Sequence, residues 1–208
     1  MSQLQAAVVD NGITGLGDHF AENPDVHYRF ERVVPGWQPT FDEDLVIVPN
    51  GADHVALLQA RDAIRVVLDR GGVVMNFCGC FTPWLPGTTW VHDSAHPNRE
   101  MRYHVVDDPL GLMHGVDPAR LSTESHGIRG WWACGGLVTR YPDQVVLADP
   151  WQRAVLVADR RSTPGLIMAT ASGPLVHPDP DAAEDQGPRT LYRNMLRVAA
   201  RQLESGHA

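Results

Sequence analysis

Thiol and imidazole side chains carry most of the capacity for chemistry in this sequence of 208 residues, which holds three cysteines and ten histidines. Cys78 directly follows the apolar run 73–77 and precedes Gly79 and Cys80. Unpaired backbone N–H groups at such a strand end would favour a thiolate, which is the nucleophilic form of cysteine. We therefore predict that Cys78 is a candidate nucleophile. The alternative is a small, buried and unreactive side chain.

The cysteines are predicted to be free thiols rather than a disulfide framework. Cys78 and Cys80 are only two positions apart, where a mutual disulfide would be strained, and Cys134 is the third cysteine.

A metal site is a second hypothesis for this region, because His92, His96 and His104 lie close in sequence to Cys78 and Cys80. Imidazole and thiolate together suit zinc or another borderline metal. The sequence has no Cys-x-x-Cys and no His-Glu-x-x-His pattern, and a proline follows His96 directly. We therefore expect no metal and no cofactor, and a metal-dependent enzyme that uses these histidines is the alternative.

A strand, a helix and a second strand are predicted to position Cys78. The first strand, 45–48, is apolar on both faces, as a strand covered by helices on both sides should be. A turn at 50–53 then ends in an N-cap aspartate, and apolar residues follow at spacings of three and four up to Gly71. This indicates a helix, and the run 73–77 completes a right-handed β-helix-β unit.

Other segments extend the predicted sheet on both sides of this unit. Residues 4–9 form a short apolar run, and 26–34 alternate as a strand nearer an edge would. Further strands are predicted at 101–106 and 165–170, and a hairpin at 144–148 with 154–158. A short helical turn is predicted at 117–121 and a terminal helix at 191–203. The proline-rich stretch between Cys80 and residue 97 is predicted to be a long loop.

Three turns are expected to meet at one edge of the sheet. They are Asp10-Asn11-Gly12, Asn50-Gly51-Ala52 and Cys78-Gly79-Cys80, and each follows a predicted strand. Chemistry in an open parallel sheet gathers at the carboxyl ends of the strands, where loops diverge. If the three strands are neighbours, the turns share one rim.

Composition restricts the class of protein. The formal net charge is −8, with no cluster of Lys and Arg, which argues against nucleic acid as a partner. No apolar run approaches the roughly 20 residues of a membrane span. We expect one α/β domain over residues 1–208, a cytoplasmic location, and a small-molecule substrate. Tryptophans such as Trp84 and Trp90 could line a pocket, close the core or form the contact of a homo-oligomer.

The order of these pieces resembles the class I glutamine amidotransferase-like superfamily, which includes amidotransferases, intracellular-protease-like enzymes and trehalose-utilisation-like proteins. Four segments carry the resemblance, at residues 8–12, 44–51, 71–78 and 169–179. The resemblance implies a flavodoxin-like, three-layer α/β sandwich with a mostly parallel sheet. The predicted hairpin would be an addition near the C-terminal half.

The same resemblance assigns roles to individual residues. Gly51 would offer its backbone N–H to an oxyanion, and Asn50 and Gly79 are further oxyanion or substrate-binding positions. Cys78 would attack, His177 would hold the proton, and Asp179 would orient the imidazole. The expected function is hydrolysis of a small-molecule amide or acyl group through a cysteine nucleophile.

Each of these residues also has a structural interpretation. The family motif around the cysteine reads Gly-x-Cys-x-Gly, whereas Asn76 and Cys80 occupy the glycine positions in this sequence. Asp179 replaces a glutamate and lies in a Pro-Asp-Pro-Asp run typical of an exposed turn, and His177 could be a surface histidine. Two alternatives stay open: a trehalose-utilisation-like protein that binds or acts on a sugar-derived molecule without a cysteine nucleophile, and a catalytically silent binding or oligomerisation domain.

Overall fold

The structure is a computed structural model. It describes residues 3–12, 16, 20, 23–77, 79–96, 100–122, 133, 135–172 and 186–206. Among the helices described, none is both long and apolar enough to cross a membrane.

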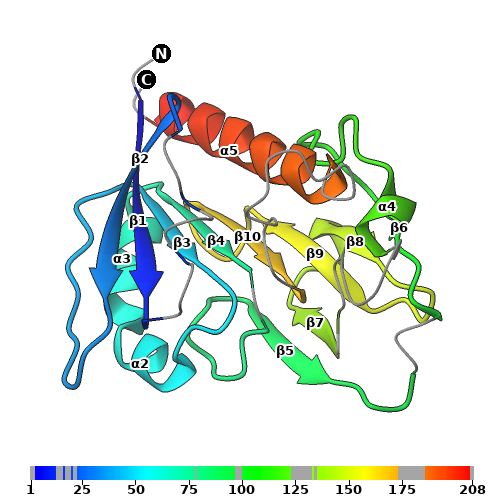
Figure 1. The fold of residues 1–208 in the computed structure, drawn as a ribbon, viewed down its shortest axis with the longest axis horizontal. Coiled ribbons are helices and arrows are strands. Elements are labelled where there is room, and N and C mark those ends of the chain that lie inside the picture. Colours follow the sequence, from blue (N-terminus) through cyan, green and yellow to red (C-terminus); the bar gives the residue numbers. More distant parts are fainter. Residues whose placement is uncertain are drawn as a thin grey trace.

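One half of the sheet is parallel. Its five strands lie in the order β2 (Val26–Arg32), β1 (Leu4–Asp10), β3 (Leu45–Val48), β4 (Val73–Asn76) and β10 (Leu166–Thr170) (Figure 1). Every residue of β3, β4 and β10 is buried, as their mainly apolar sequences predict. The alternating strand β2 lies at the edge of the sheet, which confirms its predicted position.

The other half of the sheet is antiparallel. It continues from β10 through β9 (Ala154–Asp159), β7 (Gly135–Thr139) and β5 (Thr88–His92). Off this path, β8 (Val145–Ala148) pairs with both β9 and β6 (His104–Val105). The pair β8 and β9 is the predicted hairpin, so the hairpin addition is confirmed.

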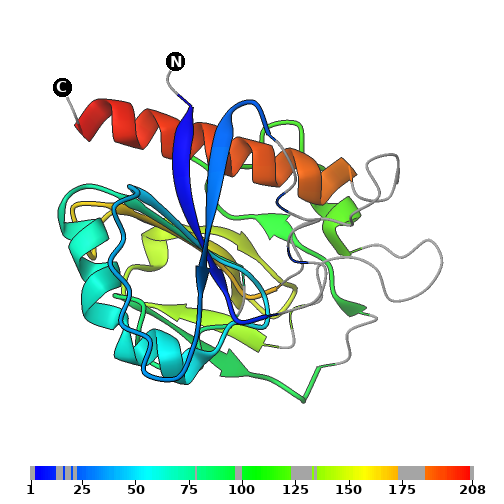
Figure 2. The ribbon, with the colours of Figure 1, turned by 60° about the vertical axis from the view of Figure 1, so that its left-hand side comes forward.

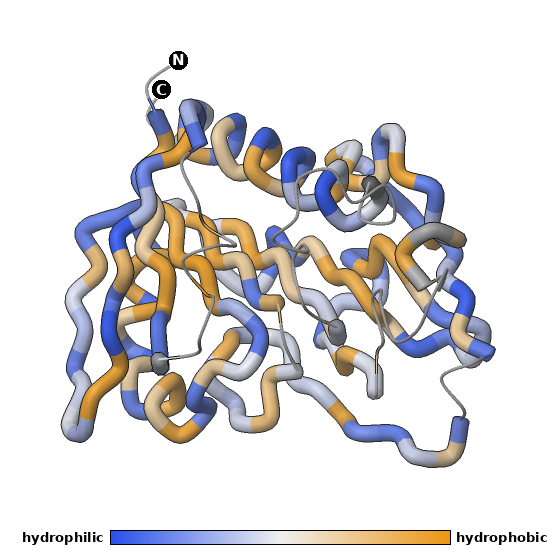
Figure 3. Tube along the Cα trace, viewed as in Figure 1, coloured by the Kyte–Doolittle hydropathy of each residue, from blue (hydrophilic) through white to orange (hydrophobic). Residues whose placement is uncertain are grey.

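Helices cover the two faces of the sheet and complete three layers. α2 (His54–Gln59) and α3 (Arg61–Asp69) lie on one face, and α5 (Gln186–Gly206) crosses the other (Figures 1 and 2). Two shorter helical turns are α4 (Pro118–Ser122) and η2 (Pro142–Gln144). The predicted flavodoxin-like, three-layer α/β fold is therefore confirmed. Figure 3 shows the hydrophobic residues concentrated on the central strands between these layers.

Local sequence accounts for the helical unit between β3 and β4. The Asp53 carboxylate accepts hydrogen bonds from the backbone N–H groups of Val55 and Ala56, so the predicted N-cap is confirmed. Ile64, at the centre of α3, is fully buried. The single predicted helix is divided at Ala60, which caps both α2 and α3.

Three segments differ from their predicted structure. The stretch beyond Cys80, which is predicted to be a loop, contains β5. The glycine-rich run around Gly135 and Gly136, for which the sequence predicts no element, contains β7. The two strands pair with each other over five residue pairs. The backbone hydrogen bonds that make each segment a strand therefore come from a partner distant in sequence. The strand predicted at 101–106 is limited to the two residues of β6.

Candidate functional site

The predicted turns do gather at one edge of the sheet. We call this edge the carboxyl rim and define it by residues 10–12, 49–51, 79–80 and 171–172, which follow β1, β3, β4 and β10. Adjacent strands in this set are parallel and in contact, so their carboxyl ends lie side by side. The Asn11 side-chain amide donates a hydrogen bond to the Gly51 carbonyl oxygen, which joins the first two turns directly.

Gly51 has the backbone geometry expected of an oxyanion donor on a tight turn. Its φ is +79°, a left-handed conformation that glycine adopts without the steric penalty of a Cβ atom. Asn50 and Gly51 are both exposed. Within the described residues, the Gly51 N–H forms no backbone hydrogen bond.

Cys78 itself lies outside the described residues, but both of its neighbours are placed. The Phe77 N–H donates to the Val48 carbonyl oxygen at 2.8 Å, which continues the β3–β4 ladder up to the residue before Cys78. Gly79 is buried against the Trp90 indole, and a Cβ atom at Gly79 would lie 2.7 Å from the ring carbons Cγ and Cδ2. The chain therefore leaves β4 in close contact with Trp90.

The two positions that flank Cys78 in the family motif are both filled by buried side chains. Asn76 is fully buried on β4, and Cys80 is 1% exposed. The Cys80 Sγ lies 3.8 Å from the Thr88 carbonyl oxygen, and the Cys80 carbonyl accepts from the Trp90 N–H at 3.1 Å. Burial raises the pKa of the Cys80 thiol to about 12, so Cys80 stays protonated at neutral pH.

His177 and Asp179 lie outside the described residues, and the strand before them ends at the carboxyl rim. β10 is parallel to β4, with Ala169 opposite Asn76. The Ala171 N–H donates to the Val155 carbonyl oxygen at 2.8 Å, so the chain remains in the sheet just beyond β10. The chain thus enters the predicted His177–Asp179 segment from the strand next to Cys78.

His54, the first residue of α2, is a candidate site residue that the sequence did not single out. The Trp84 indole N–H donates to its Nδ1 at 3.4 Å, and the Thr82 hydroxyl donates to its carbonyl oxygen at 2.8 Å. Burial lowers the pKa of His54, and the Asp53 carboxylate opposes part of this effect. Its place directly after the Asn50–Asp53 turn is the signal that could have revealed it.

Three further ring side chains, those of Phe81, Trp90 and His92, follow His54 in a row. The Phe81 ring meets the rings of His54 and Trp90 edge-on, each at a centroid distance of 4.6 Å. The Trp90 and His92 rings are 5.6 Å apart. Of these four residues, Trp90 contacts the turn directly, through Gly79 and the Cys80 carbonyl oxygen.

Two solved structures resemble this arrangement of strands over nearly the whole chain. A protein described as a component of GMP synthase, from Thermoplasma acidophilum, has a TM-score of 0.60 and 14% identity, and the match covers 100% of both chains. PurLQS from Thermotoga maritima has a TM-score of 0.62 and 15% identity, and the match covers 94% of this chain and 99% of that one. Both have the fold of class I glutamine amidotransferases. This chain has a glutamine amidotransferase-like fold. Its sequence matches no protein-family model and no curated protein.

The histidines of the metal hypothesis do not form a cluster on the amidotransferase-like fold. Among the described residues, no three His, Cys, Asp or Glu side chains lie close enough together to hold a metal ion. His96 instead binds Asp93, with 2.7 Å between Nδ1 and Oδ2, and stacks on Trp151 at 4.1 Å. His104 lies on the short strand β6.

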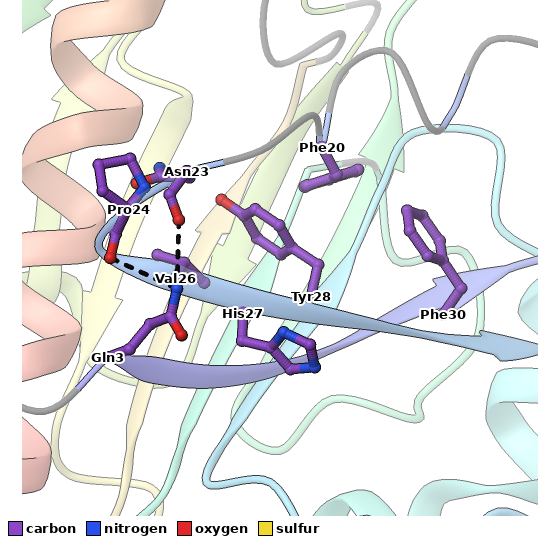
Figure 4. A pocket seen from close by; sticks show the side chains of 8 residues that line it. All are labelled: Gln3, Phe20, Asn23, Pro24, Val26, His27, Tyr28 and Phe30. Carbon is purple, nitrogen blue, oxygen red and sulfur yellow. Dashed lines mark hydrogen bonds between the residues drawn. The ribbon is translucent and has the colours of Figure 1, made fainter.

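An open pocket of about 520 Å³ lies away from the carboxyl ends of β3 and β4, along the edge strand β2 (Figure 4). Figure 4 shows the Gln3 amide bonded to the carbonyl oxygens of Asn23 and Pro24 at one end of it. The lining residues are Gln3, Phe20, Asn23, Pro24, Val26, His27, Tyr28 and Phe30. Strands β1 and β3 lie between β2 and β4 in the sheet. The Tyr192 ring links the pocket residue Phe20 to Phe77, at centroid distances of 6.5 and 6.0 Å.

Proposed function

We propose that this protein is an amidotransferase-like hydrolase that cleaves a small-molecule amide or acyl group through Cys78. One observation carries the proposal: β4, the strand that leads to Cys78, lies between β3, which leads to Gly51, and β10, which leads toward His177. A nucleophile at this position has an oxyanion donor on one side and the segment that leads to His177 on the other.

In the proposed reaction, His177 removes the proton from Cys78, and the sulfur attacks the substrate carbonyl carbon. The backbone N–H groups of Gly51 and Gly79 donate to the oxyanion that develops. The carbon–nitrogen or carbon–oxygen bond then breaks, and His177, oriented by Asp179, protonates the leaving group. Water hydrolyses the thioester, which releases the acid and restores the thiol.

The geometry of Gly51 supports this assignment. Its positive φ and the hydrogen bond from Asn11 to its carbonyl oxygen fix the turn from two directions. A preorganised donor stabilises charge in the transition state without reorganising during the reaction. The glutamine amidotransferase-like fold supports the proposal at the level of architecture. The proposal requires a small-molecule substrate and no cofactor.

A second candidate function follows from the buried side chains around Cys78. Asn76 and Cys80 fill the positions at which the cysteine motif of the family has glycine. A strained nucleophile turn needs small neighbours, so these side chains favour a protein that binds a sugar-derived molecule, as in the trehalose-utilisation-like branch, without a cysteine nucleophile.

The deciding experiment is the pH dependence of iodoacetamide alkylation, followed by mass spectrometry at each cysteine. The proposal predicts a pKa for Cys78 well below the ordinary value of about 8.5. His177→Ala should raise the pKa of Cys78 by about one unit, which would move the alkylation profile of Cys78 to higher pH by the same amount.

His104→Ala provides the matched control, because His104 is exposed on β6 and should not affect Cys78. An ordinary Cys78 pKa that is unchanged by His177→Ala would contradict the cysteine mechanism. The binding function would then be the better explanation of the fold.

A further inference from the structure

Four rings form a continuous row that contacts Gly79 through Trp90, and we call it the aromatic row: His54, Phe81, Trp90 and His92. Successive ring centroids are 4.6, 4.6 and 5.6 Å apart. The row begins three residues after Gly51 and ends at the last residue of β5. Its first two members thus follow Gly51 and Cys78 by three residues each in the sequence.

The row is held firmly at two of its members. Trp90 lies between two glycines, because Cβ atoms at Gly79 and Gly135 would come within 2.7 and 2.6 Å of its ring carbons. His54 is held through its Nδ1 by the indole of Trp84, which is almost fully buried. Preorganised rings lose little conformational freedom when a ligand stacks on them.

Phe81 is the exposed apolar member of the row, and His92 at its end is exposed as well. Although its ring contacts His54 and Trp90, 61% of the residue remains accessible to solvent. It stands three positions after Cys78. A large apolar ring that is anchored from two sides and open to solvent beside a reactive group has the properties of a ligand-binding surface.

The extent of the exposed ring indicates a small ligand. A specific protein partner buries about 800 Å² on each side, far more than one phenylalanine ring offers. The exposed Val91 does not extend the surface, because neighbouring residues of a strand point to opposite faces and Val91 lies between Trp90 and His92.

We propose that the aromatic row binds the ring of the substrate and so directs the amide or acyl carbonyl to Cys78. The substrate class is then a ring-bearing small molecule rather than an open-chain amide. The inference rests on the proposed function. Stacking of aromatic rings contributes enough to change a rate constant or an affinity by about tenfold.

Two chloroacetamides test this inference. In both, the Cys78 sulfur attacks the carbon that bears chlorine, a carbon–sulfur bond forms and chloride leaves. The probes are 2-chloroacetamide and N-benzyl-2-chloroacetamide, and each rate constant at Cys78 is divided by that of glutathione. We expect a corrected rate about tenfold higher for the benzyl compound. Phe81→Ala should reduce this ratio to about one.

Val66→Ala is the control, because Val66 is similarly exposed but lies on α3. It should leave the ratio unchanged. Equal corrected rates for the two probes in the wild-type protein would contradict the aromatic row as a binding site, while reaction with both would still support a nucleophilic Cys78.

A non-covalent measurement covers the case in which Cys78 reacts with neither probe. That result would overturn the proposed function alone. Saturation-transfer NMR with N-benzylacetamide and with acetamide then tests the row directly. Binding of the benzyl compound that disappears in Phe81→Ala supports the row, and equal signals from wild type and variant overturn it.

Discussion

The indole N–H of Trp84 donates to Nδ1 of His54 across 3.4 Å, and this bond joins the loop after β4 to the start of α2. Since Nδ1 is the acceptor, the proton of the neutral imidazole resides on Nε2. The turn that carries Gly51 and the turn that carries Cys78 are therefore coupled through a neutral histidine with a defined tautomer.

Trp84→Phe should disturb both this tautomer and the stability of the protein. Loss of one hydrogen bond and some packing at a nearly buried site is expected to lower the free energy of unfolding by about 1–2 kcal/mol. Long-range ¹⁵N spectra at pH 8 should show His54 changing from the Nε2–H form to a mixture of tautomers.

Trp37→Phe is the matched control, because the Trp37 indole donates to Glu31 at 3.0 Å, away from His54. It should lower stability similarly and leave the His54 spectrum unchanged. An unaltered His54 spectrum in Trp84→Phe would mean that Trp84 does not fix the tautomer.

The lowered pKa of His54 predicts a loss of stability on acidification. Below the ordinary histidine value of about 6.5, the unfolded chain binds a proton that the folded protein still excludes, so the free energy of unfolding falls with pH. The loss is complete once the pH is below the folded pKa. Urea unfolding from pH 8 to pH 5 should show this slope, and His54→Gln should make it shallower. An identical slope in the variant would contradict the lowered pKa.

Gly79→Ala should destabilise the turn after Cys78. The new methyl group would lie 2.7 Å from the Trp90 ring, so the ring or the backbone must move, at a cost of about 1–3 kcal/mol in the free energy of unfolding. Trp90→Leu in the same chain should recover part of this loss. If the two substitutions have additive effects on urea unfolding, the predicted contact is absent.

Much of the fold follows from short-range patterns in the sequence. The parallel core was predictable because uninterrupted apolar runs such as 45–48 are typical of strands buried on both faces. Asp53 marked the start of its helix through capping, which is a local interaction. The carboxyl rim then followed from the rule that parallel neighbours end at the same edge.

Long-range pairing accounts for what the sequence did not reveal. β5 has a single buried residue, Thr88, and it becomes a strand by pairing with β7. The contacts of His54 are with Phe81 and Trp84, which follow β4 in the sequence, whereas His54 precedes it. These contacts join residues that are far apart in the sequence, so no local sequence pattern predicts the aromatic row.

Cys80 should resist alkylation in the folded protein. Its pKa of about 12 leaves almost no thiolate at pH 8, and burial blocks access of the reagent. Mass spectrometry after iodoacetamide treatment should find Cys80 labelled only when denaturant is present, and the denatured sample is the control for intrinsic reactivity. Labelling in the native state at the rate of a free peptide would contradict the placement of this side chain.

Asp93 holds the loop after β5 against the β8–β9 turn, because its carboxylate binds both His96 and Arg153. The hydrogen bond with His96 is the main cause that lowers the pKa of Asp93 to about 2, and the Ala95 N–H contributes to the same shift. Since the folded value is below the unfolded value of about 3.9, this stabilisation is complete above that pH and is lost as the pH falls through 2.

Asp93→Asn should therefore flatten the dependence of the urea midpoint on pH between about 4 and 2.5, while lowering the midpoint at pH 6. Asp62→Asn is the control, because the Asp62 side chain is 94% exposed and should change neither quantity appreciably. If Asp93→Asn retains the wild-type acid slope, the carboxylate does not link the two loops in solution. A shallower slope would identify Asp93 as the group whose protonation releases the β8–β9 turn from the end of β5.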